Sequence, residues 1–216
     1  MIPPTSIDGT DITGATIDGT DVQEITVDGN VVFSAGPASE GFEHNNLSGN
    51  YVGDLSAFQI QSSIVDEGSF ALEAIGGGSN ALIVRTTGSE FNRFGKRIDW
   101  KQYLGTGGNS NGGLAFVDET GGWSGSNGYR FFVSDEFNYV RILGLDQPSV
   151  DSGITNYSIT NNQWLDASVE FPSNGDMVFT FDGQTVTLND TQVTDGYLGF
   201  HRFDPVYYDD IRFSTI

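Results

Sequence analysis

Carboxylates are the commonest reactive groups in this chain, so a catalytic pair of them is the first chemistry to consider. The 216 residues include 29 Asp and Glu but only 9 Lys and Arg. Glycoside hydrolysis needs two carboxylates about 5 to 10 Å apart, and one strand can present them because alternate residues share a face. No Glu-x-Asp-x-x-Glu run occurs, and the acidic pairs Asp118-Glu119 and Asp135-Glu136 stand beside turn residues. We expect solvated turn carboxylates there, which leaves a glucanase-like hydrolase as the less favoured alternative.

Nucleophilic catalysis and phosphate chemistry also lack their usual residues. The chain has no Cys, and only His44 and His201 could act as an imidazole base. Neither the Gly-x-Ser-x-Gly motif of serine hydrolases nor the Gly-x-x-x-x-Gly-Lys phosphate loop is present. These absences predict a protein that is not an enzyme.

Trp123 is the strongest candidate for contact with a sugar. It stands between two glycines and a Ser-Gly pair, where no neighbour in the sequence would bury it. Pyranose rings pack their C–H faces on flat aromatic rings, while amides and carboxylates bind the hydroxyls. Tyr129 and Asn127 follow in the same segment, and Asp118 and Asn109 could act as polar partners. Alternatively, Trp123 folds back onto the core or packs in an oligomer contact.

Short alternating runs of apolar residues position these side chains from residue 40 onward. About a dozen such runs are separated by clusters of Gly, Asn and Asp, and no segment of ten or more residues has helical periodicity. The pattern predicts an all-β fold, an antiparallel two-sheet jelly-roll sandwich. Five aromatic residues of these runs are expected on the inner faces of the sheets: Phe131, Phe132, Tyr139, Phe179 and Phe181.

The first 33 residues repeat one phrase three times at ten-residue spacing. The phrases occupy residues 7–12, 17–22 and 27–32, and each places Asp-Gly between β-branched residues. Asp-Gly favours a tight type I′ hairpin, because both central residues need positive φ. Such short hairpins cannot bury enough apolar surface to be stable alone, so we predict that they oligomerise. The predicted division is an anchoring arm over residues 1–34, a linker over 35–40 and a jelly-roll domain over 41–216.

The acidic composition limits the partners of the protein. Its formal net charge is −20 and its pI is about 4.1, so nucleic acid and anionic membranes are repelled. The acids are spread along the whole chain, which favours a solvating surface suited to high salt and a halophilic source; an interface for cations or basic partners is the other interpretation. No signal sequence or bilayer-spanning apolar segment is present, so we expect no membrane insertion.

Segments at both ends of the predicted domain resemble the concanavalin A-like, laminin G-like jelly rolls. These segments are Gly41-Phe42-Glu43, Val65–Leu72, Gly196–Phe200 and Tyr207–Ile211. Together they span nearly all of the domain, and the resemblance implies the same sandwich that the alternating runs predict.

The same resemblance implies a structural Ca²⁺ beside the first and last strands. Calcium takes six to eight oxygen ligands from carboxylates and backbone carbonyls. Carried over to this sequence, the ligands are Glu43, the backbone of Gly68 or Ser69, and Asp210. Alternatively, Glu43 and Asp210 are solvated or pair with Arg212.

The repeated Ile-Asp-Gly-Thr arm ahead of such a domain, in so acidic a chain, resembles surface proteins of tailed viruses that infect haloarchaea. The resemblance implies a virion structural protein, either a capsid decoration or turret or a tail fibre, made in the host cytoplasm without a signal peptide. Its expected partners are further copies of itself through residues 1–34, capsid or tail proteins, and host surface glycans or a glycosylated surface layer. A free carbohydrate-binding or adhesin module of a halophile is the alternative.

Overall fold

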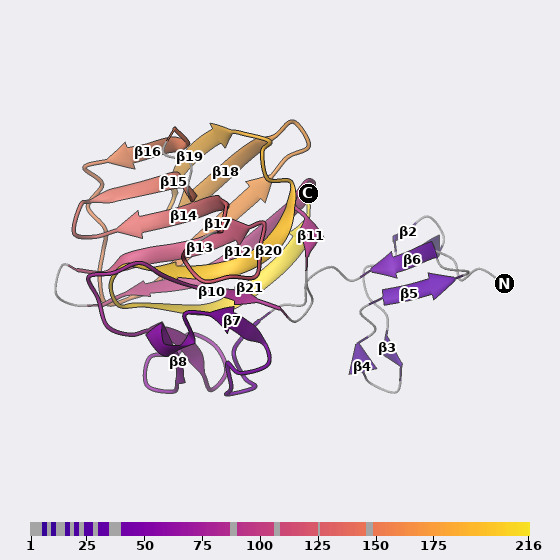
Figure 1. The fold of residues 1–216 in the computed structure, drawn as a ribbon, viewed down its shortest axis with the longest axis horizontal. Helices are drawn as coiled ribbons and strands as arrows, with labels where there is room; N and C mark the ends of the chain where they lie inside the picture. Colours follow the sequence, from indigo (N-terminus) through magenta and orange to yellow (C-terminus); the bar gives the residue numbers. More distant parts are fainter. Residues whose placement is uncertain are drawn as a thin grey trace. The chain divides into compact units, whose positions relative to one another are not determined.

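The protein is all-β in a computed structural model (Figure 1). Two compact units divide the chain, residues 1–38 and residues 39–216. The structure describes residues 40–86, 90–105, 109–124, 126–145 and 149–216, and the backbone of six short strands between residues 6 and 34.

The arm consists of three two-stranded hairpins, as its repeat predicts. The register places Ile7 opposite Thr10 and Ile17 opposite Thr20, which leaves a two-residue connection in each hairpin. The Asp-Gly pairs of the three turns lie outside the described residues. The paired strands are β1 (Ser6–Ile7) with β2 (Thr10–Asp11), β3 (Thr16–Ile17) with β4 (Thr20–Asp21), and β5 (Glu24–Val27) with β6 (Asn30–Ser34).

One sheet of the domain has eight strands, of which β13 to β16 follow one another as a meander (Figure 1). The strand order is β16-β15-β14-β13-β20-β10-β7, with β11 also paired to β20. β20 returns late in the chain to lie between β13 and β10, so this sheet joins segments far apart in the sequence. The bounds are β7 (Tyr51–Gly53), β10 (Ala81–Arg85), β11 (Phe91–Asn92), β13 (Asn111–Val117), β14 (Gly128–Ser134), β15 (Tyr139–Leu145), β16 (Asp151–Thr155) and β20 (Asp195–Arg202).

The second sheet has seven strands in the order β19-β18-β17-β12-β21-β9-β8. The β18–β19 hairpin turns at Asp182 and Gly183, both at positive φ, as an Asp-Gly turn requires. The bounds are β8 (Phe58–Gln61), β9 (Ala71–Ala74), β12 (Lys96–Leu104), β17 (Trp164–Phe171), β18 (Asp176–Phe181), β19 (Gln184–Asn189) and β21 (Val206–Thr215). The two antiparallel sheets confirm the predicted jelly-roll sandwich.

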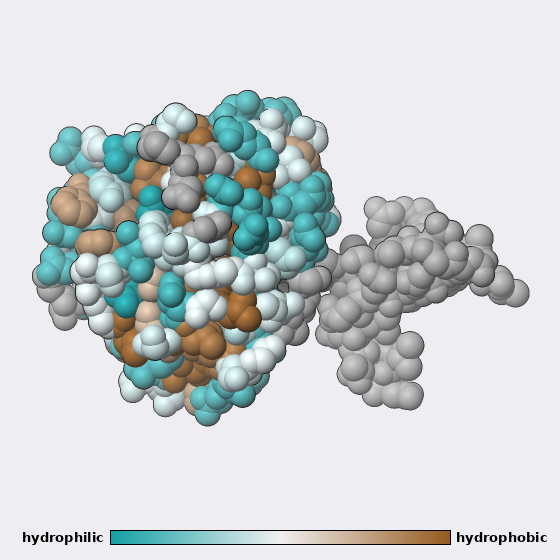
Figure 2. Space-filling view, viewed as in Figure 1, coloured by the Kyte–Doolittle hydropathy of each residue, from teal (hydrophilic) through white to brown (hydrophobic). Residues whose placement is uncertain are grey.

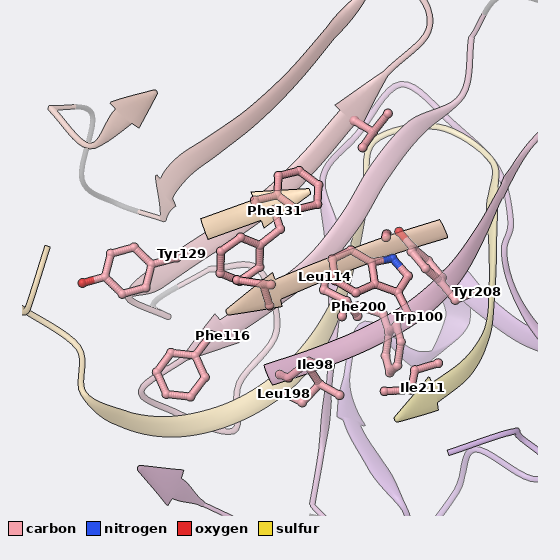
Figure 3. Close-up of a cluster of buried hydrophobic side chains, with 14 of the residues drawn as sticks. Ile98, Trp100, Leu114, Phe116, Tyr129, Phe131, Leu198, Phe200, Tyr208 and Ile211 are labelled. Atoms are coloured by element: carbon pink, nitrogen blue, oxygen red, sulfur yellow. The ribbon is translucent and has the colours of Figure 1, made fainter. Parts of the chain in front are cut away.

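The inner faces of the two sheets form one continuous core (Figure 3). Trp100 of β12 stacks on Phe179 of β18, with ring centroids 5.7 Å apart and planes 5° from parallel. Phe131 of β14 lies 5.7 Å from the same Phe179 ring. These contacts join the two sheets through large apolar side chains, whose burial is the main stabilising contribution to such a fold.

Two of the five aromatic residues predicted on the inner faces lie elsewhere. Phe131, Phe179 and Phe181 are in the core, but Phe132 and Tyr139 pack together on the opposite face of their sheet, 5.9 Å apart. Neighbouring residues of a strand point to opposite faces. Because Phe131 enters the core, Phe132 must point away from it.

Glu40, the last residue of the predicted linker, belongs to the domain. Its backbone N–H and C=O both bond to Ile211 of β21 at 2.8 Å. Its buried carboxylate accepts a hydrogen bond from the Tyr51 hydroxyl (2.9 Å) and lies 3.7 Å from Arg85 Nη2. A buried carboxylate is tolerated only with such partners, so this residue is fixed to the last strand. The rest of the predicted linker, 35–39, lies outside the described residues.

The visible surface of the domain is largely hydrophilic, with smaller apolar patches (Figure 2). Helical structure in the described ranges is limited to one short 3₁₀ turn, η1 (Leu55–Ala57). None of the described helical structure is therefore long and apolar enough to cross a membrane.

Candidate functional site

The outer face of the eight-stranded sheet, which is turned away from the core, carries a cluster of aromatic and basic side chains. Phe131 of β14 points into the core, so Arg130 and Phe132 on either side of it point outward. The register places Arg130 opposite Ala115 of β13, and Phe132 opposite Gly113. Both large side chains therefore stand opposite small residues of the neighbouring strand.

A pocket of about 230 Å³ opens on this face, and we refer to it as the sheet-face pocket. Its lining combines aromatic rings with amides and one guanidinium, a set of groups that can bind both the apolar and the hydroxylated parts of a small ligand. The lining residues are Asn80, Asn111, Arg130, Phe132, Phe137, Tyr139, Leu143 and Phe203.

Three aromatic rings form one wall of the sheet-face pocket. Phe137 and Tyr139 stack with centroids 5.9 Å apart and planes 10° from parallel, and Phe132 lies 5.9 Å from Tyr139. Phe137 is 57% exposed although it is a large apolar residue. The turn between β14 and β15 holds it there: Asn138 has a φ of 53°, and the Phe137 N–H donates to Ser134 Oγ at 3.1 Å. The turn therefore presents a flat ring to solvent at the pocket.

Arg130 supplies a positive charge to the pocket. Its Cζ lies 4.9 Å from the centroid of the Trp123 ring and 5.6 Å from that of Phe132. Its Nε is buried without a hydrogen-bond acceptor in the described part of the chain. Burial lowers the pKa of the Arg130 guanidinium, and the neighbouring Tyr139 opposes this effect. Because a guanidinium stays protonated in proteins, the pocket contains a cation whose donors are not all used.

His201 of β20 lies beneath the cluster, fully buried. Its ring centroid is 4.7 Å from that of Trp123 and 5.2 Å from that of Phe132, and its Nε2 lies 3.0 Å from Asn80 Oδ1. Burial, with smaller contributions from Arg130 and Arg202, holds the pKa of His201 well below its ordinary value. The neutral ring therefore donates from Nε2 to the Asn80 oxygen, which orients that amide at the pocket.

Asn111, at the start of β13, supplies an acceptor. Its Nδ2 donates to Asp204 Oδ2 at 2.5 Å and to Glu136 Oε2 at 3.0 Å. Its Oδ1 is buried and has no hydrogen-bond partner among the described residues. A buried amide oxygen without a partner costs free energy, and here it belongs to a residue that lines the sheet-face pocket.

Trp123 folds back onto the outer face of the eight-stranded sheet, not onto the core as the alternative for it expected. Its backbone N–H donates to Asp54 Oδ2 at 3.1 Å, and the same carboxylate oxygen accepts from Leu82 N–H at 3.0 Å. The half-buried Trp123 ring packs beside a small outer cluster that includes Leu82 and Val84. Its loop passes so close to Gly53 (φ 105°) that a Cβ there would lie 3.0 Å from the Gly121 oxygen. Trp123 thus covers His201 and supports Arg130.

The other four predicted sugar contacts are divided between the two faces of the sheet and the two ends of β13. Tyr129 is fully buried on the core face of β14, opposite the face on which Trp123 packs. Asn127 and Asp118 bond to each other, with the Asn127 N–H 2.9 Å from Asp118 Oδ1. Asn109 precedes β13 whereas Asp118 follows it, and the seven residues of that strand, which extend over about 20 Å, lie between them.

The predicted calcium ligands form direct hydrogen bonds and ion pairs. Glu43 Oε1 accepts the backbone N–H groups of Ser69 (2.9 Å) and Phe70 (3.2 Å), whereas Asp210 Oδ1 accepts from Arg212 Nε at 2.6 Å. A Cβ on Gly68 would lie 2.2 Å from Glu43 Oε1, so the carboxylate packs closely on this loop.

Both side-chain ligands of the predicted calcium site thus have direct protein partners: Glu43 Oε1 accepts two N–H groups and Asp210 Oδ1 accepts from Arg212. The structural Ca²⁺ stays a prediction. The residues that the structure describes also contain no group of three or more His, Asp or Glu side chains that could hold a metal ion.

A larger pocket, of about 710 Å³, lies on the outer face of the seven-stranded sheet. Its basic groups are already paired: Arg97 Nη2 lies 2.7 Å from Asp99 Oδ1, Lys101 Nζ lies 2.8 Å from Asp166 Oδ1, and Arg212 Nη2 lies 2.8 Å from Glu67 Oε2. Trp100, the single aromatic lining residue, is 2% exposed because it packs in the core. This pocket offers no free ring surface to a ligand.

Asn109 lines a third pocket, of about 470 Å³. Tyr103 and Tyr207 meet there edge to face, with centroids 5.5 Å apart and planes 89° from parallel. The Tyr207 hydroxyl donates to Glu73 Oε1 at 3.1 Å, and burial together with Glu73 raises the pKa of Tyr207 to about 12. This pocket has aromatic residues but no unpaired cation among its lining residues.

Sequence analysis missed Arg130, Phe137, Asn80 and Asn111 as site residues. A signal was available for the β14 residues, because Phe131 and Phe132 are adjacent and one of them must face away from the core. No local signal points to Asn80 or Asn111, which reach the pocket only because β20 and β13 are neighbours in the sheet.

No protein-family model and no curated protein matches the sequence. Solved structures share its fold at low identity. A carbohydrate-binding module, CBM66 from Bacillus subtilis, has a TM-score of 0.55 and 15% identity over 76% of this chain and 99% of its own. A legume lectin-like domain from Entamoeba histolytica has a TM-score of 0.56 and 11% identity, covering 75% and 91%. A family 16 endo-glucanase from Bacteroides ovatus has a TM-score of 0.54 and 10% identity, covering 82% and 99%.

Proposed function

We propose that the domain is a non-catalytic carbohydrate-binding module and that the sheet-face pocket is its binding site. One observation carries this proposal: the Phe137–Tyr139 stack, Arg130 and two amide side chains all line the same pocket. A sugar would pack its C–H face on the exposed ring and bond its hydroxyls to the guanidinium and amides. The fold shared with a carbohydrate-binding module and a lectin-like domain supports the same function.

Binding to a glycan panel tests the site. Phe137→Ala removes the exposed ring without touching the core, and we expect it to weaken binding about threefold to tenfold, the usual contribution of an aromatic contact. Tyr103→Ala in the third pocket is the matched control and should leave affinity within twofold. If Tyr103→Ala lost binding and Phe137→Ala kept it, the binding site would be the third pocket and the sheet-face pocket would be excluded.

Hydrolysis, the activity of the family 16 neighbour, has less support. A general acid at neutral pH needs a raised carboxyl pKa. Burial raises the pKa of the Asp209 carboxyl group. That carboxylate accepts the backbone N–H groups of Asp66, Glu67 and Asp210 at 2.8 to 3.2 Å, which makes it a structural group.

We further propose that the module is displayed on a virion surface, as a capsid decoration, turret or tail fibre, and that it meets host glycans there. The support is the arm: three successive hairpins of two to five residues per strand form a unit distinct from the domain. Hairpins of this size need partners to be stable, so copies of the chain or capsid and tail proteins would provide them. A free halophilic adhesin with the same pocket is the alternative.

A further inference from the structure

Among the described residues, the one cation that lines the sheet-face pocket, Arg130, has no carboxylate within 4.0 Å. Ion pairs within this distance involve Arg85, Arg97, Lys101, Arg141 and Arg212. Arg93, Lys96 and Arg202 are also in none of them, but they do not line this pocket. The neighbours of Arg130 are aromatic rings.

Burial makes this missing counter-ion energetically important. Removing a charge from water costs free energy unless an opposite charge or hydrogen bonds compensate. The Nε of Arg130 is buried without an acceptor, and the aromatic faces of Trp123 and Phe132 compensate only in part. An oxyanion that enters the pocket would supply the opposite charge beside the guanidinium.

The other polar groups of the pocket fit a sugar that carries such an anion. Asn80 Oδ1 is occupied by His201, so its amide NH₂ is available as a second donor. Asn111 also lines the pocket, and its buried Oδ1 has no hydrogen-bond partner among the described residues. Glu136 and Asp204 are nearby acids, and both accept from the Asn111 amide. A third nearby acid, Asp151, lies 3.6 Å from Arg141 Nε.

We infer that the sheet-face pocket recognises an acidic sugar residue, whose carboxylate or sulfate group binds Arg130 while its ring packs on Phe137. This inference rests on the proposed carbohydrate-binding function and adds the class of ligand. The volume of about 230 Å³ is below the range of pockets for drug-sized ligands, which fits one sugar ring of a longer chain.

Net charge cannot produce such binding by general attraction. With a formal charge of −20, the protein repels polyanions at long range, and 1 M KCl shortens the screening length to about 3 Å. Binding of an acidic glycan in 1 M KCl would therefore result from direct contacts in the pocket and not from long-range electrostatic attraction.

The test measures dissociation constants in 1 M KCl for two matched pairs of probes. Oligogalacturonate is compared with its methyl ester, and dextran sulfate with dextran, so that the carboxylate and sulfate arms are separate. We expect the full-length protein to bind at least one charged probe about 10- to 100-fold more tightly than its neutral partner, as a hydrogen-bonded charge contributes. Arg130→Gln should remove this preference, and Arg130→Lys should keep part of it.

Arg141→Gln is the matched control, because Arg141 lies on the same face over Tyr139 but is 3.6 Å from Asp151. It changes the net charge equally and should leave the preference for charged probes unchanged.

Equal affinity for charged and neutral probes, with both weakened by Phe137→Ala, would overturn the inference of an acidic ligand and leave the proposed sugar site intact. Absence of binding to every probe and to the glycan panel would overturn both. The comparison between probes uses the unmodified protein, so it decides the matter even if Arg130→Gln fails to fold.

Discussion

The protonation of one buried residue, His201, makes the stability of the domain depend on pH. Its imidazole is fully buried between Trp123, Phe132 and Asn80, and burial keeps its pKa well below the ordinary value of about 6.5. The folded protein therefore holds the ring neutral, whereas the unfolded chain takes up a proton as the pH falls through about 6.5. More protons bound in the unfolded state mean that acid favours unfolding.

We predict that the free energy of unfolding falls as the pH is lowered from 7.5 to 5.5, by up to about 1.4 kcal/mol per pH unit from this residue. His201→Gln keeps a donor for Asn80 but does not titrate, so its curve should be flatter in this range. Denaturant unfolding at several pH values measures both curves. Parallel curves for the two proteins would show that His201 does not carry the pH dependence.

Trp123 and Tyr129 show why residue type alone is a weak guide to a binding site. Both are aromatic and lie near glycines, yet Trp123 packs on the outer face and Tyr129 in the core. The deciding factor for Tyr129 is strand alternation, and for Trp123 it is the Asp54 carboxylate, which holds the loop to β10. The exposed ring at the pocket is Phe137, a turn residue.

At the level of elements, the loop between β8 and β9 is fastened by two carboxylates from distant segments. Asp209 Oδ2 accepts the N–H groups of Asp66 and Glu67, and Glu43 accepts those of Ser69 and Phe70. Each carboxylate thus binds two successive amides, which joins the loop to both the first and the last segments of the domain. Calcium was predicted at this place, where it would hold the ends of the domain together. In the structure, direct hydrogen bonds from the β8–β9 loop to Glu43 and Asp209 connect the same segments.

We predict that Glu43→Ala lowers the melting temperature by about 2 to 4 °C, because about 1 kcal/mol is lost with the two hydrogen bonds. A chelator should leave the melting temperature of the unmodified protein unchanged. Glu119→Ala, which removes one exposed turn acid, is the control for charge. A chelator-induced decrease that disappears in Asp210→Ala would instead establish the calcium site.

For the whole molecule, the arm and the domain have different sources of stability. The domain has a continuous core of its own between two sheets. The arm forms hairpins with strands of two to five residues, and such hairpins are marginal alone in water. A net charge of −20 also opposes association at low salt, so assembly through the arm should require screening.

We predict that the full chain is an oligomer in molar salt and that deletion of residues 1–34 yields a monomer. Mass measurement in solution checks both species. The melting temperature of the shortened chain should stay within a few degrees of the original, because the core of the domain is unaffected. A monomeric full chain, or an oligomer that survives the deletion, would contradict the role of the arm in assembly.

Local patterns account for the predicted parts of the fold. Asp-Gly pairs predict hairpins because their turn geometry depends on two residues only, and both the arm and the Asp182-Gly183 turn follow this rule. Alternation of apolar residues predicts strands because the side-chain period is a property of the strand itself. The sequence alone thus determined an all-β sandwich preceded by a repeated arm.

Tertiary structure decided which residues share a site. Alternation separates Arg130 from Phe131 but does not say which of them faces the core. That choice depends on the pairing of β14 with β13 and β15. The strand order β13-β20-β10 brings Asn111 and Asn80 to the same pocket. Strand order and register join segments far apart in the chain, so no local pattern contains them. The sequence does not show that Arg130 has no carboxylate partner among the described residues, because its neighbours come from several strands of the sheet.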